Sequence, residues 1–262
     1  MRIISAVRRR IQTCVLGLGL LACGAASGAG AAPSAGAASR PASRPNIVWI
    51  MADDLGYADT GITGRSATAT PNIDRIAKDG LFLSQSYANS AVCSATRVGL
   101  MTGRYQYRLR AGLDEPLGRN PEVGLPSAQP TLPALLRGAG YRTVLVGKWH
   151  LGQGQDSGPL KSGYERFYGI MTGGTDYFRH QPNALPDGIG SALLDGSAPS
   201  GDSGYLTQLF GQRAVQEIRA ARADRVPLFM SLHFTAPHWP WEGPEDAAVA
   251  AQVTDLQHRD GG

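Results

Sequence analysis

The chain has 262 residues, enough for one sizeable α/β domain, and 42% of them are hydrophobic, which excludes a globally disordered protein. Its formal net charge is +4, from 25 basic and 21 acidic residues. Residues 1–32 hold four of the basic residues and no acidic one, so the remaining 21 basic and 21 acidic residues balance. The basic character therefore belongs to the N-terminal segment and does not indicate a nucleic-acid partner.

Residues 1–32 have the three parts of a secretory signal peptide. Basic residues come first, an apolar run from Val15 to Ala22 follows, and small residues fill the rest. The run is shorter than the roughly 20 residues of a transmembrane helix. The segment predicts a substrate of the export machinery, periplasmic or secreted. Cleavage near Ala32 would release a soluble protein, whereas cleavage at a lipobox-like sequence before Cys23 would leave it lipid-anchored.

Cys93 is the only cysteine beyond this segment, because Cys14 and Cys23 both lie inside it. An exported chain with one remaining cysteine cannot form an internal disulfide. Cys93 can instead be a buried small side chain, a thiol nucleophile, a metal ligand or the precursor of a modified residue. The rest of the sequence has to distinguish these roles.

A flexible linker is predicted at residues 33–44 and a domain at residues 45–262. The domain begins with an apolar run at residues 46–51, typical of a central strand covered on both faces. Asp53 and Asp54 follow at its carboxyl end, where open α/β sheets build their sites. Adjacent carboxylates can be ordinary turn residues, but in a crevice they need a cation. Oxygen ligands favour calcium or magnesium.

A helix is predicted from Thr70 to Gly80, with Thr70 as its N-cap and Gly80 just past its end. Residues 81–88 alternate enough to predict a strand. The next helix would begin at Cys93, where unpaired backbone N–H groups favour negative charge. Arg97 lies one turn further on the same helix face.

The middle of the chain is predicted to contain a long loop at residues 104–129, a short helix at 131–137 and a strand at 141–147. Lys148 and His150 follow the strand. Because they are two residues apart in extended chain, they point the same way. A lone histidine is most often structural, whereas an aligned lysine and histidine at the end of a strand favour a site.

The last third predicts a polar and aromatic loop at residues 173–180, in which Asp176 and His180 could face a substrate, and a further loop at 182–204. An amphipathic helix at 206–223 and a buried strand at 227–235 follow, and His238 comes just after that strand. The alternation of strands and helices predicts the α/β class, a mostly parallel sheet with helices on both faces.

Five motifs, in this order, resemble the type I sulfatases, which are formylglycine-dependent, arylsulfatase-like members of the alkaline phosphatase superfamily. They are residues 45–48 leading to Asp53 and Asp54, residues 70–74, residues 93–97, residues 147–152 and residues 237–240. The resemblance covers residue 44 to the end of the chain and implies the alkaline-phosphatase-like sulfatase fold.

The resemblance implies that a formylglycine-generating maturation enzyme oxidises Cys93. The hydrated aldehyde has two hydroxyls: one attacks the sulfur of a sulfate monoester, and the other loses a proton so that sulfate can leave. Asp53, Asp54 and the converted Cys93 would bind Ca²⁺, with Mg²⁺ as the lesser alternative. The substrate would be a sulfated small molecule or glycan.

The remaining roles also come from the resemblance. Arg97 would hold the hydrated aldehyde, and Lys148 would bridge it to a sulfate oxygen. His150 would take the proton that triggers sulfate release. His238 would bind sulfate or protonate the leaving alcohol. Asp176 and His180 would contact the substrate.

Two departures from the family pattern are visible. Ala95 stands where the modification motif usually has proline, and neither an Asp-Asn pair nor a lysine follows His238. The chain is therefore expected to be an N-terminal part of the catalytic domain, incomplete at its C-terminus. Two other functions remain open. One is a phosphonate or phosphodiester hydrolase with the same site, and the other is an inactive remnant that binds calcium or a glycan.

Overall fold

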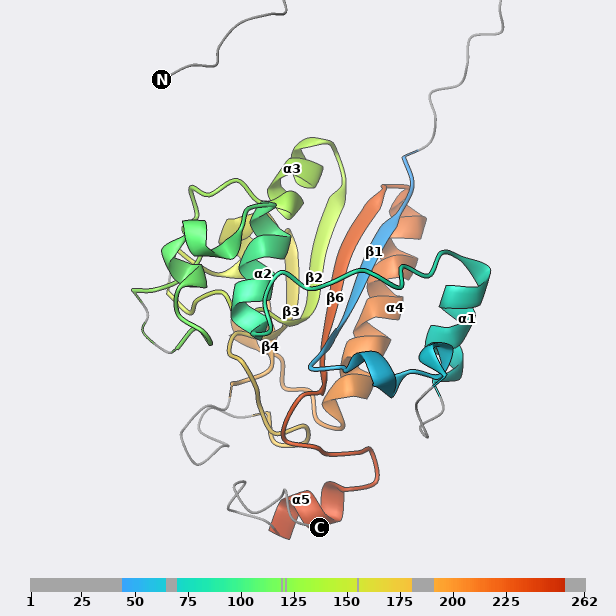
Figure 1. The fold of residues 1–262 in the computed structure, drawn as a ribbon. Helices are drawn as coiled ribbons and strands as arrows, with labels where there is room; N and C mark the ends of the chain where they lie inside the picture. The colour runs from blue at the N-terminus through green and yellow to red at the C-terminus, as the bar shows by residue number, and fades with distance from the viewer. Residues whose placement is uncertain are drawn as a thin grey trace, which may run out of the picture. The chain divides into compact units, whose positions relative to one another are not determined.

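The computed structural model describes residues 44–64, 70–118, 120, 122–154, 156–180 and 191–252 (Figure 1). Contacts divide the chain into two units, Met1–Ala42 and Ser43–Gly262, and all the described residues belong to the second. The predictions for the signal peptide, the lipobox and nearly all of the linker therefore lie outside the described residues. Within the described residues, no helix is both long and apolar enough to cross a membrane.

The described residues form one sheet of six strands in the order β1-β6-β2-β3-β4-β5. The first four strands in this order are parallel to one another. Strand β4 is antiparallel to β3, and β5 is antiparallel to β4. The strands are β1 Ile47–Asp53, β2 Arg142–Lys148, β3 Arg166–Ile170, β4 Leu194–Asp195, β5 Ala198–Pro199 and β6 Leu228–Pro237. The prediction of a mostly parallel sheet is confirmed, whereas β4 and β5 lie in the stretch predicted to be loop.

Five α-helices accompany the sheet in the described part of the chain. They are α1 Pro71–Asp79, α2 Cys93–Thr102, α3 Leu132–Gly138, α4 Leu206–Asp224 and α5 Ala247–Gln252. Short 3₁₀ helices occur at Tyr57–Asp59, Gly61–Thr63, Gln106–Arg108, Arg110–Gly112 and Pro159–Ser162. The Thr131 side chain caps α3 by accepting a hydrogen bond from the backbone N–H of Ala134. Helices α1 to α4 thus begin and end close to the predicted positions, whereas α5 was not predicted.

Two apolar clusters lie on opposite faces of the sheet, because successive side chains of a strand point to opposite faces. Leu228, Met230 and Leu232 of β6 pack with Phe210 and other residues of α4. Phe229 packs in the second cluster, together with α2 residues and partly buried leucines of α3. Helices therefore cover both faces of the sheet, as predicted, with α4 on one face and α2 and α3 on the other (Figure 1).

Residues 81–88 are not a strand, so the prediction for this stretch is wrong. They form turns and irregular backbone that link α1 to α2 (Figure 1). The alternation is present, but a strand also needs a neighbouring backbone to complete its ladder, and no described strand provides one here. Leu81 and Leu83 are exposed as a result.

The prediction that both faces of the first strand are covered is also wrong for the described part of the chain. Strand β1 is at the edge of the sheet, where it pairs only with β6. Its side chains at Trp49 and Ile50 are 45% and 55% exposed. An apolar run shows that a strand favours burial, but it does not show which segment will cover it.

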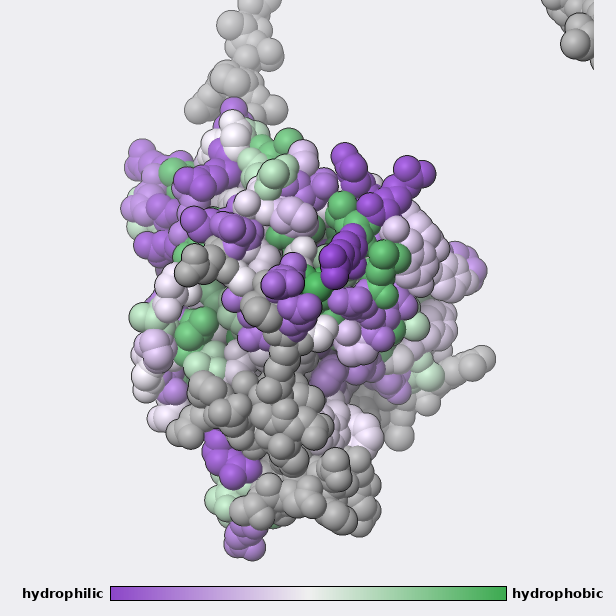
Figure 2. Space-filling model, turned by 90° about the vertical axis from the view of Figure 1, so that its left-hand side faces the viewer, coloured by the Kyte–Doolittle hydropathy of each residue, from purple (hydrophilic) through white to green (hydrophobic). Residues whose placement is uncertain are grey.

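Much of the remaining surface is mixed in character. Figure 2 shows the face that lies at the left of Figure 1, where hydrophilic residues surround small apolar groups. Scattered apolar side chains of this kind are normal on soluble proteins. The exposed side chains of β1 are different because they belong to one continuous strand.

Candidate active site

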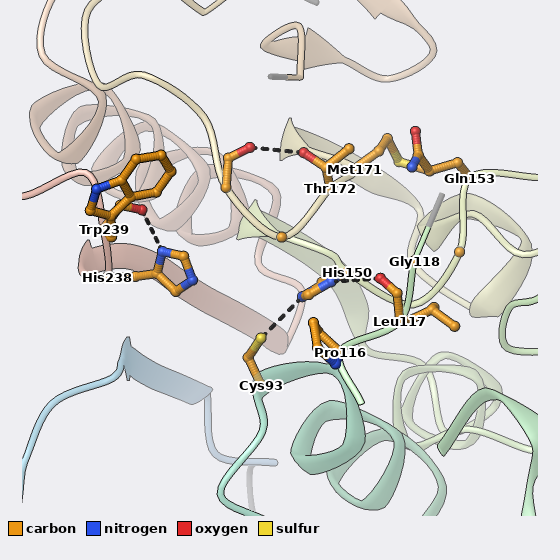
Figure 3. A pocket seen from close by; sticks show the side chains of 13 residues that line it. Cys93, Pro116, Leu117, Gly118, His150, Gln153, Met171, Thr172, His238 and Trp239 are labelled. Carbon is orange, nitrogen blue, oxygen red and sulfur yellow. Dashed lines mark hydrogen bonds between the residues drawn. The ribbon is translucent and has the colours of Figure 1, made fainter. Parts of the chain in front are cut away.

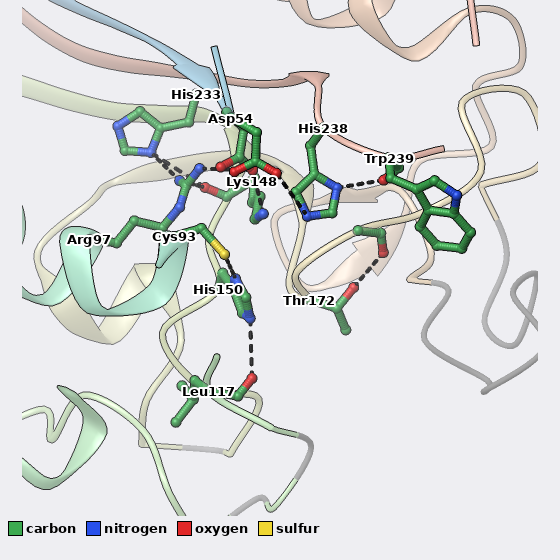
Figure 4. Close-up of polar contacts among 12 residues, drawn as sticks. Asp54, Cys93, Arg97, Leu117, Lys148, His150, Thr172, His233, His238 and Trp239 are labelled. Carbon is green, nitrogen blue, oxygen red and sulfur yellow. Dashed lines mark hydrogen bonds and ion pairs between the residues drawn. The ribbon is translucent and has the colours of Figure 1, made fainter. Parts of the chain in front are cut away.

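The candidate site is at the carboxyl ends of three neighbouring parallel strands. Strand β1 ends at Asp53 and β2 ends at Lys148, while β6 between them contributes His233, which lies opposite Gly147. Helix α2 begins at Cys93, so Arg97 is in its second turn and faces the same strand ends (Figure 4). Segments distant in sequence thus meet at the end of the sheet where parallel α/β proteins build their sites.

Asp53, Lys148 and Arg97 form a buried charged cluster. The Lys148 Nζ atom pairs directly with Asp53 Oδ2, and Arg97 Nη2 lies 3.5 Å from the same oxygen. Burial would raise the pKa of Asp53, but the positive charges of Lys148 and Arg97 outweigh it and lower that pKa. Burial, followed by the Arg97 charge, lowers the pKa of Lys148. The cluster therefore holds two basic groups against one carboxylate, which favours an additional anion.

Arg97 has donors to spare within this cluster. Its Nη1 donates to the Lys148 carbonyl at 2.7 Å and lies 3.0 Å from His233 Nδ1. Its Nε and Nη2 are buried without a hydrogen-bond partner among the described residues. Buried donors of this kind normally have an acceptor. They are suitable for holding an oxyanion or a polar side chain at residue 93.

Cys93 and His150 face one another at the N-terminus of α2. The Cys93 Sγ atom lies 3.2 Å from His150 Nδ1, and His150 Nε2 lies 3.1 Å from the Leu117 carbonyl oxygen. A carbonyl only accepts, so Nε2 carries the proton and Nδ1 presents its lone pair to residue 93. Burial first, and then the charges of Lys148 and Arg97, lower the pKa of His150 to about 3. His150 is therefore neutral at physiological pH.

Asp54 and His238 lie on the exposed side of the site. The backbone of Asp54 has φ +63°, so its carboxylate turns away from the buried Asp53 and is exposed. Its Oδ2 lies 3.8 Å from His238 Nε2 (Figure 4). The loop that carries His238 is held in place because its carbonyl accepts a hydrogen bond from the Tyr177 hydroxyl at 2.9 Å. Non-glycine residues with such φ values are uncommon and gather at functional sites.

A cavity of about 450 Å³ opens beside these residues. Cys93, His150 and His238 line it, together with apolar residues such as Met171 and Trp239 (Figure 3). Cavities of this size, with an apolar lining and a few convergent polar groups, are typical of small-molecule sites. The nucleophile candidate is thus accessible to a ligand.

Asp176 and His180 have other partners. Asp176 is fully buried and accepts hydrogen bonds from the backbone N–H groups of Phe178 and Arg179, and it also pairs with the Arg179 side chain. His180 Nε2 lies 2.9 Å from the Tyr177 carbonyl. Neither residue is among those that line the cavity. Their contact with a substrate stays a prediction.

Sequence reasoning missed His233, Trp239 and the Leu117 carbonyl. His233 is 2% exposed and stands in an otherwise apolar stretch of β6, so a titratable residue in a buried strand was the available signal. Trp239 directly follows His238 and forms part of the cavity wall. The role of the Leu117 carbonyl left no signal in the sequence, because every residue has a backbone carbonyl.

The described residues offer the type of ligand that a hard cation prefers, but too few ligands to hold one. Asp53 and Asp54 are adjacent carboxylates, and oxygen ligands suit calcium. No group of three or more His, Cys, Asp or Glu side chains in the described ranges is arranged to hold a metal. Calcium takes six to eight oxygen ligands. Further ligands would have to come from water, substrate, the converted residue 93 or parts of the protein outside these ranges.

Together, the fold and the site define an α/β protein with a candidate nucleophile beside an anion-binding cluster. The Sulfatase family model matches residues 45–260, so the chain belongs to the Sulfatase family. Mouse arylsulfatase J is 37% identical over 217 residues, which cover 81% of this chain and 35% of that protein. Human steryl-sulfatase is 44% identical over 146 residues, or 51% of this chain and 25% of that protein.

A solved structure shows the same fold. Ps i-CgsB, crystallised with k-i-k-neocarrahexaose, is 31% identical with a TM-score of 0.70, and the match covers 82% of this chain and 50% of that one. This chain therefore spans half or less of the length of these relatives.

Proposed function

We propose that this protein hydrolyses sulfate monoesters, and that Cys93 is the precursor of its nucleophile. Membership of the Sulfatase family supports the reaction class. The observation that carries the proposal is the pairing of the His150 Nδ1 lone pair with the Cys93 side chain, next to a buried cluster with more positive than negative groups. A sulfate ester is an anion and needs such a cluster.

The nucleophile would be formylglycine, made from Cys93 by a maturation enzyme. When formed and hydrated, it supplies two hydroxyl groups on one carbon: one would take the sulfuryl group, and loss of the proton from the other would re-form the aldehyde as the C–O bond to sulfate breaks. His150 faces that carbon with an unprotonated Nδ1, and its protonated Nε2 is fixed by the Leu117 carbonyl. His150 would take the proton from the second hydroxyl.

Basic side chains would hold the sulfate group. Lys148 is fully buried with its ammonium group on Asp53, close to the strand ends, so it would contact a sulfate oxygen as a fixed donor. Arg97 would hold the hydroxyls of residue 93, because its buried Nε has no hydrogen-bond partner among the described residues and its Nη2 has only the 3.5 Å ion pair with Asp53. His238 lines the cavity, where it would bind sulfate or protonate the leaving alcohol.

Asp53 and Asp54 would hold calcium, together with the converted residue 93 and ligands beyond the described residues. Bound calcium would polarise the sulfate oxygens and stabilise negative charge at residue 93. Asp54 has the more accessible carboxylate, whereas Asp53 remains paired with Lys148. Magnesium is the lesser alternative because it requires a stricter octahedral geometry.

The substrate would be a sulfated small molecule or glycan, cleaved after the protein has been exported. The described cavity wall combines apolar residues with Trp239, which suits an aryl or sugar ring stacked on the indole. The basic and apolar N-terminal segment supports export to the periplasm or beyond.

The proposal is tested on protein made together with a formylglycine-generating enzyme. Mass spectrometry of the peptide that contains Cys93 should show formylglycine, and 4-nitrophenyl sulfate should be cleaved faster than an aryl phosphonate. Cys93→Ala should lower kcat at least ~1000-fold, because it removes the nucleophile. Faster phosphonate cleavage would favour the phosphonate hydrolase, whereas folded, modified protein without turnover would favour the inactive remnant.

A further inference from the structure

His233 is a buried histidine with a defined geometry and no assigned role. Its Nδ1 lies 3.0 Å from Arg97 Nη1, and Arg97 is itself 1% exposed. The guanidinium group only donates hydrogen bonds, so in this contact His233 Nδ1 accepts and its proton is on Nε2, which is buried without a hydrogen-bond partner among the described residues. The same Nδ1 lies 3.4 Å from the Lys148 carbonyl, a longer contact in which only the other tautomer could donate. The shorter contact, to Arg97, favours the Nε2–H tautomer of His233 and holds one Arg97 nitrogen in position (Figure 4).

The neutral form of His233 is the one that the surroundings favour. Burial first, and then the Arg97 charge, lower its pKa to about 3. A protonated His233 would place a second positive charge against Arg97 and would remove the acceptor. The Lys148 carbonyl is the other acceptor for the same Arg97 nitrogen, at 2.7 Å. Two strands therefore hold one guanidinium nitrogen between them.

The position of His233 on its strand explains why it can reach Arg97. Phe229 packs in the same cluster as α2 residues, and His233 is four positions further along β6 on the same face. Its carbonyl group is in the ladder with β2, opposite Gly147. The side chain is therefore fixed by strand register and not by an adjustable loop.

We propose that His233 is a positioning residue, which accepts a hydrogen bond from Arg97 and so fixes the guanidinium group between Asp53 and the side chain of residue 93. Arg97 Nη2 lies 3.5 Å from Asp53 Oδ2, and Arg97 is one turn after residue 93 on the same face of α2. If His233 only filled space, an apolar side chain of similar size would serve equally well. The inference uses the site of the proposed function but does not depend on sulfate turnover.

The first test is the tautomer of His233. The 262-residue chain, labelled with ¹⁵N-histidine and with Cys93 unmodified, should give a neutral Nε2–H signal for His233 near pH 7, assigned by its loss in His233→Asn. A neutral Nδ1–H tautomer, or a charged ring, would overturn the proposal because neither can accept from Arg97.

The second test separates positioning from packing. In His233→Asn the side-chain oxygen takes the place of Nδ1, in His233→Gln it lies one methylene further out, and His233→Leu has no acceptor. Alkylation of Cys93 by iodoacetamide should keep its wild-type rate in His233→Asn and slow roughly tenfold in His233→Leu, because a guanidinium group that is no longer held gives less stabilisation to the attacking sulfur. His233→Gln should lie between them.

Phe229→Leu is the matched control. Phe229 is buried on the same strand face and packs in the apolar cluster, and its side chain cannot form a hydrogen bond with Arg97. The substitution should lower the melting temperature and leave the alkylation rate unchanged. Equal rates in His233→Leu and wild type would contradict positioning. If His233→Leu fails to fold, the wild-type tautomer and the rate of His233→Asn still decide. All these measurements use the thiol, so they stay informative even if the protein does not cleave sulfate esters.

Discussion

Individual side chains at the site carry charge that an ordinary core would not hold. Lys148 and Arg97 are almost completely buried, and both are near one buried carboxylate, that of Asp53. Burying an ion costs several kcal/mol, and removing one partner of such a group leaves the others uncompensated. A buried excess of basic groups is therefore better explained by an anionic ligand than by fold stability.

The buried histidines should make folding sensitive to acid. His150 and His233 each have a pKa lowered by burial from 6.5 to about 3. Between these two values the unfolded chain binds more protons, so the free energy of unfolding falls as pH falls. Each histidine accounts for on the order of 4 to 5 kcal/mol across that window, which together rivals the whole stability of a typical domain. The chain should therefore unfold before pH 3 is reached.

Denaturant titrations at several pH values between about 3 and 6.5 would measure this slope. His233→Asn should flatten it, because asparagine does not titrate. A free energy of unfolding that is independent of pH in this window would contradict the neutral, buried state of both histidines.

Spacing in the sequence predicted where most of these side chains lie. Cys93 and Arg97 share a face of α2, and Lys148 and His150 follow β2, as their sequence patterns indicated. The separation of Asp53 from Asp54 could not be predicted. It depends on a left-handed backbone at Asp54, which turns one carboxylate inward and the other toward solvent.

Among the elements, strand β2 depends on a glycine that the sequence does not distinguish from its neighbours. Gly147 has φ +115°, and a Cβ atom there would lie 1.8 Å from the backbone oxygen of His233. Any side chain would push β2 away from β6 at the end of the sheet where Lys148 and His233 must meet. The close approach of these two strands therefore sets the geometry of the site.

Gly147→Ala should destabilise the protein by at least about 2 kcal/mol, since it combines backbone strain with an overlap that a strand cannot relieve. Chemical denaturation measures the loss. Gly211→Ala is the matched control, because Gly211 lies within α4 with open space around it, and alanine should raise stability by up to about 1 kcal/mol. Similar effects of the two substitutions would contradict the close approach.

The elements also show where sequence patterns stop being informative. The helix at residues 71–79 and the strand at 142–148 were predicted from capping residues and apolar periodicity, which are local features of the sequence. Residues 81–88 have a strand-like alternation but form no strand, because a ladder needs a partner that the local sequence does not specify. Pairing is a property of the sheet and cannot be seen in one segment.

For the described molecule as a whole, the main unusual feature is the exposed apolar edge strand β1. Val48, Trp49 and Ile50 are between 40% and 55% exposed, and one edge of their strand has no partner among the described residues. Such an edge is a template for pairing with other chains. The sequence predicted the strand and its apolar character, but it gave no means of knowing which segment would lie against it.

The 262-residue chain should therefore self-associate as its concentration rises. Ile50→Lys should reduce this association, because a charge on an edge strand opposes pairing between chains. Leu135→Lys is the control, since Leu135 is 67% exposed but lies on α3, which has no free strand edge. Light scattering over a concentration series would measure both. Equal behaviour of the two variants would show that the strand edge is not the contact.

The pairing of β1 has a consequence for the order of folding. The side chain of Asn46, just before β1, accepts a hydrogen bond from the backbone N–H of Leu228, 182 residues later in the chain. Contacts of such long range are slow to form because the intervening loop must close first. During synthesis β1 emerges early but has no partner until β6 has also emerged. The sheet can therefore be completed at its first strand only after most of the described chain is available.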